Sequence, residues 1–301
     1  MQSQPIDFHP PAGDAAQILL PTTASMFGDR ADRFDRLASG HALGDWLNFL
    51  GMLSRAQQHA LKNLPELPLP PTAQLEQAAT HAMPPLDLGQ RPAAWRTALR
   101  SIVGELATEA PAAAADTLAR LQNAGDAYLD TLADALLNGA LEAENAAELP
   151  FVAAALQVIY SQLASQLPAA SLQKLEPHNV CPCCGSPAVA SIVRLGAEIN
   201  NLRYLHCSLC NTEWNVPRAV CTHCDTDKAV ALQELEGNAG AVRAETCDSC
   251  HSYLKIVYQE KDPHVDPVAD DLATLALDIL VDEAGYQRSG PNLLLVGAYG
   301  G

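Results

Sequence analysis

Cys181-Pro-Cys-Cys-Gly-Ser-Pro187 opens the stretch that decides the fold of this 301-residue chain. Three more pairs of cysteines follow it, each with two residues between its members. All nine cysteines lie between Cys181 and Cys250, and the first 180 residues contain none. Small secreted domains held together by disulfides do not normally segregate their cysteines in this way. The stretch therefore predicts metal or redox chemistry in the C-terminal third.

The four cysteine pairs form an internal repeat. Adding 40 to each residue number of the first two pairs gives the last two, and 22 residues separate the pairs in each half. A fixed offset indicates one structural unit used twice. A CxxC turn directs two thiolates toward one point, and a second turn carried by a β-hairpin completes a tetrahedral site. The predicted ligands are the first cysteine set, Cys181, Cys184, Cys207 and Cys210, and the second cysteine set, Cys221, Cys224, Cys247 and Cys250.

The ligands alone leave the metal open. Four thiolates in a tetrahedron suit zinc and a single rubredoxin-type iron almost equally. Zinc would be a structural ion without redox chemistry, whereas iron would give an electron-transfer or redox-sensing centre. Zinc is the more common occupant of such sites. Redox dithiols are the alternative to metal binding, but they would not recur at a common offset.

The ninth cysteine, Cys183, occupies the position that the repeat gives to His223. One interpretation is an exposed thiol beside a metal; the other, which we favour, is a spectator or an alternative ligand. Since eight cysteines already complete two sites, the histidines of this region are expected to support the ligands or to lie at the surface. They are His178, His206, His223 and His251.

Residues 1–175 are predicted to form an α-helical domain, because apolar residues recur there at spacings of three and four. Proline-rich connectors at 64–71 and 84–92 divide the helices. The aromatic residues at helical spacing are expected in the core. A run of arginines is expected on a solvated helix face rather than on a surface that docks an acidic partner. The stripes include Leu43, Trp46, Leu47, Leu50, Leu53, Trp95, Leu99, Ile102, Phe151, Leu156 and Ile159; the further aromatics are Tyr128 and Tyr160, and the arginines are Arg30, Arg33 and Arg36.

After Pro177 the pattern changes to short β-prone runs, 188–195 and 229–235, between the CxxC turns. We expect two tandem rubredoxin-like or zinc-ribbon-like modules, at 176–218 and 219–260. Residues 261–301 are expected to form a C-terminal helix and tail. On that helix Leu272, Leu275, Ala276, Ile279 and Leu280 are apolar, and Asp270, Asp271, Asp278 and Asp282 form the polar face. The predicted fold class is multidomain, α plus small metal-stapled β.

The charge balance excludes several functions. The chain carries 18 Lys and Arg against 35 Asp and Glu, a net charge of -17, which disfavours nucleic acid and anionic membranes. Residues 181–260 hold six basic and nine acidic side chains, the wrong sign for a zinc-ribbon that binds phosphate. Residues 1–13 show no leader pattern, and no stretch is apolar enough to span a bilayer, so we expect a cytoplasmic protein without membrane insertion. No GxGxxG, Walker A, HExxH or GxSxG pattern appears, which predicts a protein that is not an enzyme.

Several segments share a pattern with one protein family. They are Cys181-Pro-Cys-Cys-Gly-Ser-Pro; Tyr204-Leu-His-Cys-Ser-Leu-Cys with Trp214; the pairs Cys221/Cys224 and Cys247/Cys250; Asp270-Asp-Leu-Ala-Thr-Leu-Ala-Leu-Asp; and His41-Ala-Leu-Gly-Asp-Trp-Leu-Asn-Phe-Leu, followed by Arg55-Ala-Gln. Together they resemble the formate dehydrogenase accessory proteins of the FdhE family, over most of the chain and best from 181 to 280. The cysteine pairs and the Asp-Asp-Leu segment are the specific features.

The resemblance implies a chaperone-like cytoplasmic assembly factor for respiratory, molybdenum-containing formate dehydrogenases. Such a factor contacts the catalytic subunit before export and carries rubredoxin-like iron. The family's cysteines correspond position by position to the four pairs of this chain, so the resemblance shifts the expected metal from zinc to iron. The sequence leaves the oligomeric state open.

Overall fold

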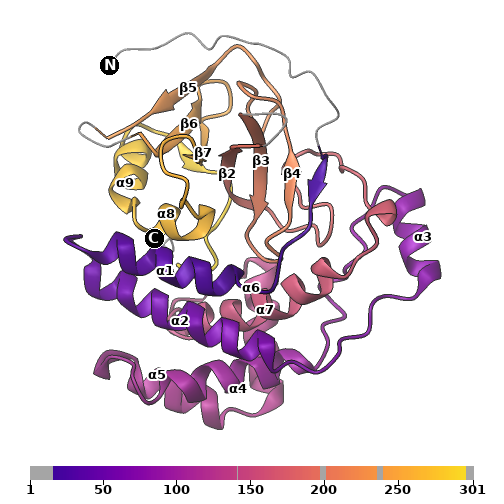
Figure 1. The fold of residues 1–301 in the computed structure, drawn as a ribbon, viewed down its shortest axis with the longest axis vertical. Coiled ribbons are helices and arrows are strands. Elements are labelled where there is room, and N and C mark those ends of the chain that lie inside the picture. Colours follow the sequence, from indigo (N-terminus) through magenta and orange to yellow (C-terminus); the bar gives the residue numbers. More distant parts are fainter. Residues whose placement is uncertain (1–15, 141, 197–200, 236–239, 296–301) are drawn as a thin grey trace.

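The computed structural model describes residues 16–140, 142–196, 201–235 and 240–295. Two segments on which the sequence analysis made predictions lie outside these residues. They are 1–13, where no leader peptide is expected, and 296–301, the end of the expected C-terminal tail. Figure 1 shows the N-terminal helices gathered beneath one end of a β-sheet. The helices are α1 (Met26–Ala38), α2 (Gly44–Lys62), α3 (Thr72–Thr80), α4 (Ala94–Leu106), α5 (Ala112–Asn123), α6 (Asp126–Asn138) and α7 (Leu149–Ser165), with short 3-10 turns at Ala143–Asn145 and Ala169–Ser171.

The predicted apolar stripes form the helical core. Leu47, Leu50 and Leu53 of α2 are buried, and Trp95 and its neighbours on α4 pack with them. Helix α7 is buried on nearly all sides, with Pro150 in its first turn, where proline is tolerated. The core continues without a break from these helices into the sheet and the first cysteine set.

Tyr128 was predicted to lie in the core, and that prediction is wrong. Its side chain is exposed, and its hydroxyl donates a hydrogen bond of 2.8 Å to Glu148 Oε2. Leu43, at the start of the first stripe, is also exposed. A helical spacing places such residues near the apolar face, but the neighbouring elements decide how far the buried area extends. Among the described helices, none combines the length and the apolar character needed to cross a bilayer.

The two halves of the repeat form one continuous sheet. Its order is β1-β4-β3-β2-β7-β6-β5, with β8 beside β7. Each half is an antiparallel meander, and the two join where β2 runs parallel to β7, with Ser191 opposite Ile256 and Val193 opposite Tyr258. The strands are β1 (Ile18–Leu19), β2 (Ala188–Arg194), β3 (Leu202–Cys207), β4 (Glu213–Asn215), β5 (Val230–Gln233), β6 (Val242–Cys247), β7 (Ser252–Tyr258) and β8 (Gln287–Arg288).

The predicted C-terminal helix is divided into α8 (Pro267–Leu272) and α9 (Leu275–Glu283). Leu272 is buried and Asp282 is exposed, as expected, but the expected polarity is wrong at other positions. Asp271 is fully buried, whereas Ile279 is 59% exposed. The cause is a pair of cations, the buried Lys255 and the partly buried Arg288: Lys255 Nζ lies 3.2 Å from Asp271 Oδ1, and Arg288 Nη2 lies 2.7 Å from the same oxygen. Lys255 lies on β7 and Arg288 on β8, so the periodicity of the helix could not predict that they would pair with Asp271. Asp270 and Asp278 are buried with Asp271, and Leu280 is exposed with Ile279.

The arginine stripe of α1 also lies in a different environment from the expected one. Arg33 is buried, and its guanidinium donates to Asp270 at 2.5 and 2.9 Å and to Asp262 at 2.6 Å. Arg30 is buried as well and pairs with Asp266 at 3.0 Å. The solvated-face prediction is therefore wrong for both residues. Their ion pairs join α1 to α8 and to the segment that precedes α8.

We predict that Arg33→Ala lowers the free energy of unfolding by about 3–5 kcal/mol, because it leaves the buried carboxylate of Asp270 without its partner. Arg55→Ala is the matched control, since Arg55 pairs with Asp35 at the surface and such pairs contribute about 1 kcal/mol or less. Urea titrations followed by circular dichroism measure both changes. Equal losses in the two variants would contradict the structural importance of the Arg33 pair.

Candidate metal centres

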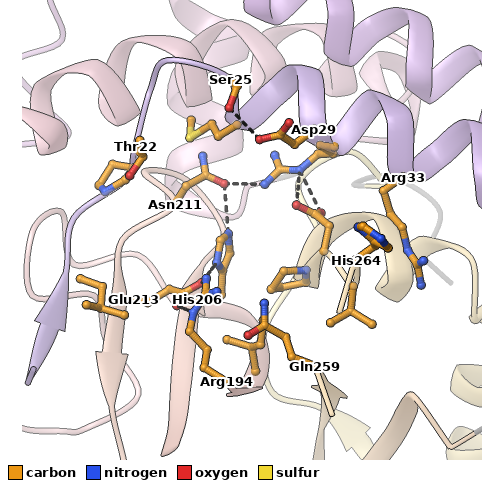
Figure 2. A pocket seen from close by; sticks show the side chains of 18 of the residues that line it. Thr22, Ser25, Asp29, Arg33, Arg194, His206, Asn211, Glu213, Gln259 and His264 are labelled. Atoms are coloured by element: carbon orange, nitrogen blue, oxygen red, sulfur yellow. Dashed lines mark hydrogen bonds and ion pairs between the residues drawn. The ribbon is translucent and has the colours of Figure 1, made fainter. Parts of the chain in front are cut away.

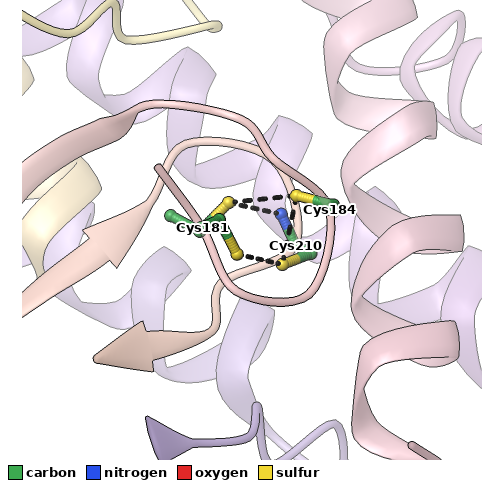
Figure 3. Close-up of side chains that lie close together, drawn as sticks. Cys181, Cys184 and Cys210 are labelled. Carbon is green, nitrogen blue, oxygen red and sulfur yellow. Dashed lines mark hydrogen bonds between the residues drawn. The ribbon is translucent and has the colours of Figure 1, made fainter. Parts of the chain in front are cut away.

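The first cysteine set converges where the first two CxxC turns meet (Figure 3). The Sγ atoms of Cys181 and Cys210 are 3.4 Å apart, and that of Cys184 lies 3.5 Å from those of Cys207 and Cys210. All four thiols are free of disulfides and buried. Four sulfur atoms with this spacing form a compact donor set.

The second cysteine set repeats the arrangement. The Sγ atoms of Cys221 and Cys250 are 3.7 Å apart, as are those of Cys224 and Cys247. In each set, the sulfur atoms all lie within 4.8 Å of one another. The structure therefore brings together the eight predicted cysteines in two groups of four, divided between the halves of the repeat.

The backbone of the CxxC turns is repeated in detail. The amide of Cys183 donates to Cys181 Sγ at 3.4 Å, and the amide of His223 donates to Cys221 Sγ at the same distance. The residue after the first turn of each half has a left-handed backbone, with φ of 76° at Gly185 and 58° at Asp225. Such a conformation closes a tight turn, and glycine and aspartate tolerate it best. The residue after the second CxxC turn of each half also has a left-handed backbone, with φ of 57° at Asn211 and 54° at His251.

Each donor set fits a tetrahedrally coordinated ion. A metal–sulfur distance of about 2.3 Å places the sulfur atoms of a tetrahedron about 3.8 Å apart, close to the distances in both sets. Each set could therefore hold one metal ion, and this geometry suits zinc and iron alike.

Burial raises the pKa of both Cys181 and Cys207 well above that of an ordinary thiol, and it raises the pKa of Cys221 to about 12. Burial acts in the same direction on Cys250, but hydrogen bonds from Ser252 outweigh it and lower the pKa to about 7. Metal ligation needs thiolates, so binding would release protons from the buried cysteines.

Helix α7 and the 84–88 segment hold the first cysteine set in place. The side-chain amide of Gln157 donates to the carbonyl oxygen of Ser208 at 2.8 Å, and Asn211 Nδ2 donates to Ser161 Oγ at 2.8 Å. The amide of Leu86 donates to the carbonyl of Cys183 at 3.0 Å. These contacts join the turns to the helical part, and sequence reasoning did not predict them.

A cleft of about 670 Å³ lies between α1, β2, β3 and the 259–267 segment, and Asn211, next to Cys210 in the chain, is among its lining residues (Figure 2). Asn211 Oδ1 accepts from Arg30 Nη2 at 2.8 Å and lies 3.1 Å from His206 Nε2. His206 Nδ1 lies 3.0 Å from Glu213 Oε1, and Arg194 donates two bonds of 2.6 Å to the same carboxylate. Burial alone would raise the pKa of Glu213, but His206 and Arg194 lower it to about 2. The network fixes the turn between Cys207 and Cys210 against α1.

The other residues that the sequence analysis named near the cysteines, which are Cys183, four histidines and Trp214, differ in burial and in their contacts. Cys183 is fully buried and belongs to neither group of four, so the exposed-thiol interpretation is wrong. None of the four nearby histidines belongs to a group. His206 is buried and hydrogen-bonded, whereas His223 and His251 are exposed. Trp214 packs in the core, where its indole donates to the carbonyl of His178 at 2.7 Å.

Comparison with known proteins gives one consistent result. Family models described as FdhE, N-terminal, FdhE, central domain, and FdhE, C-terminal domain match residues 15–177, 180–218 and 219–295. A protein FdhE homolog of Serratia proteamaculans is 41% identical over 281 residues, which are 92% of this chain and 90% of that protein. A homolog of Edwardsiella ictaluri is 42% identical over 94% of this chain and 92% of its own length.

The structural comparison agrees with these matches. The crystal structure of the FdhE protein from Pseudomonas aeruginosa superposes with a TM-score of 0.84 at 39% identity, and covers 93% of this chain and 99% of that one. The chain belongs to the FdhE family, as the sequence motifs predicted.

We predict that Cys207→Ser and Cys247→Ser each lower the metal content by one equivalent, because each removes one sulfur from a separate donor set. The double variant should lose both equivalents. Elemental analysis of anaerobically purified protein measures the content. Cys183→Ser is the control, since this buried cysteine belongs to neither set, and should retain both ions. Loss of both ions in either single variant would contradict independent sites.

Proposed function

We propose that this protein is a non-catalytic maturation factor for a respiratory molybdenum formate dehydrogenase, which binds the catalytic subunit in the cytoplasm. The observation that carries the proposal is the pair of four-cysteine sets in a chain that belongs to the FdhE family. The family resemblance supplies the link to formate dehydrogenase.

The proposed ligands are the eight cysteines of the two sets, and the proposed occupant of each is one iron ion. A four-thiolate iron site supplies one-electron redox chemistry when the ion is bound. The chain's own contribution is to hold the sulfur atoms at tetrahedral spacing and to direct backbone amides at them, as at Cys181 and Cys221. Hydrogen bonds to the sulfurs and exposure to water set the potential of such a site.

A protein partner also suits the charge of the chain. With a net charge of -17, the surface would repel phosphate backbones and anionic lipids. Two basic side chains of α1, Arg30 and Arg33, are buried and form ion pairs inside the molecule, so they are not available to an outside partner. These features favour association with another protein over association with nucleic acid.

We predict that a strain lacking this protein loses formate dehydrogenase activity, and that the wild-type gene restores it. A variant with Cys221→Ser and Cys224→Ser should leave activity near the level of the deletion strain, because the second cysteine set could no longer hold an ion. Enzyme assays of cell extracts measure the effect. Co-purification of the catalytic subunit with the tagged wild-type protein tests the partner.

Circular dichroism of the purified variant serves as the folding control, and the helical signal should be retained. Cys183→Ser is the matched variant, because it also removes a thiol from a CxxC turn but from neither set. Full activity in the deletion strain would remove the proposed assembly role. Unchanged formate dehydrogenase activity with every variant that replaces a cysteine of either set would show that the two sets are not needed for the assembly role.

A further inference from the structure

The two cysteine sets share one backbone geometry but differ in exposure. Every cysteine of the first set is at most 2% exposed. In the second set, Cys221 and Cys247 are buried, whereas Cys224 is exposed and Cys250 is partly exposed. Water and dissolved molecules therefore reach the second set directly.

The sequence differs between the halves at the positions that surround the ligands. In the first half these positions are buried, and 40 residues later their counterparts are exposed and polar. The second half thus lacks the side chains that a covering element would pack against. The matched pairs are Cys183 with His223, Ser208 with Asp248, Leu209 with Ser249, and Asn211 with His251.

The cover of the first set comes from the helical part of the chain. Gln157 and Ser161 of α7 bond to Ser208 and Asn211, and Leu86 bonds to the turn of the first pair. An outside ligand could reach the first set only after these contacts separate. Such opening is a local unfolding event, and its free-energy cost slows every process that needs it.

We propose that the second cysteine set is an exchangeable metal site, open to sulfur or nitrogen donors from solution at Cys224, whereas the first set retains its ion. This proposal rests on the proposed metal binding. Sulfur and imidazole donors both suit zinc and iron, and His223 and His251 add exposed imidazoles to the two turns of the second set. The first set would therefore hold a structural ion, and the second set would hold an ion that exchanges with solution.

The test uses the purified full chain loaded with two equivalents of zinc and mixed with the chromogenic chelator pyridylazoresorcinol. Release should occur in two phases of one equivalent each. The second phase should be at least about tenfold slower, because an opening step that costs about 1.4 kcal/mol already lowers the accessible fraction tenfold. Cys224→Ser should remove the fast phase. Cys184→Ser, its counterpart in the repeat, should retain the fast phase and lose the slow one.

A second measurement does not depend on the variants. The zinc-loaded wild-type protein is treated with iodoacetamide, and modified residues are identified by mass spectrometry with time. Cys224 and Cys250 should be alkylated before any cysteine of the first set. Release of both equivalents in one phase, or earlier alkylation of the first set, would overturn the proposal. Failure to take up zinc would instead overturn the metal binding itself, and neither result depends on formate dehydrogenase activity.

Discussion

The convergence of four buried sulfur atoms in the first cysteine set is the constraint on which the rest of the structure depends. These atoms lie within 4.8 Å of one another inside the main core, where burial raises the pKa of Cys181 and Cys207. Four thiolates at this distance would repel strongly in a low-dielectric interior unless a cation lies among them. Because the helices pack directly on this set, closure of the site and docking of the helical part are one event.

Buried ion pairs hold the remaining elements around this centre. Arg33 of α1 bonds to Asp270, and Lys255 of β7 bonds to Asp271 and Asp278. Burying such charges costs solvation energy that their attraction only partly offsets. Their main effect is geometric, since moving α1, α8 or β7 within the packed core would leave a buried charge without its partner. The network therefore fixes how the helical part meets the sheet.

The repeat illustrates how one local structure acquires two environments. The turns at Cys181 and Cys221 have the same amide-to-sulfur bond, and Asn211 and His251 share a left-handed backbone. Yet hydrogen bonds from α7 cover the first of the two sets, whereas the second faces water at Cys224. Identical ligands thus differ in accessibility, which for a metal-thiolate site is a functional property.

The sequence by itself determined the local features: the helical stripes such as Leu47, Leu50 and Leu53, the hairpins of the repeat, and the family. These follow from periodicity and fixed spacing, which depend only on neighbouring residues. It did not determine that Asp271 would be buried, that Arg33 would leave the solvent, or that the two halves would join through β2 and β7. Only the tertiary structure decided these points, because a charged side chain is buried only where a distant segment brings it a partner.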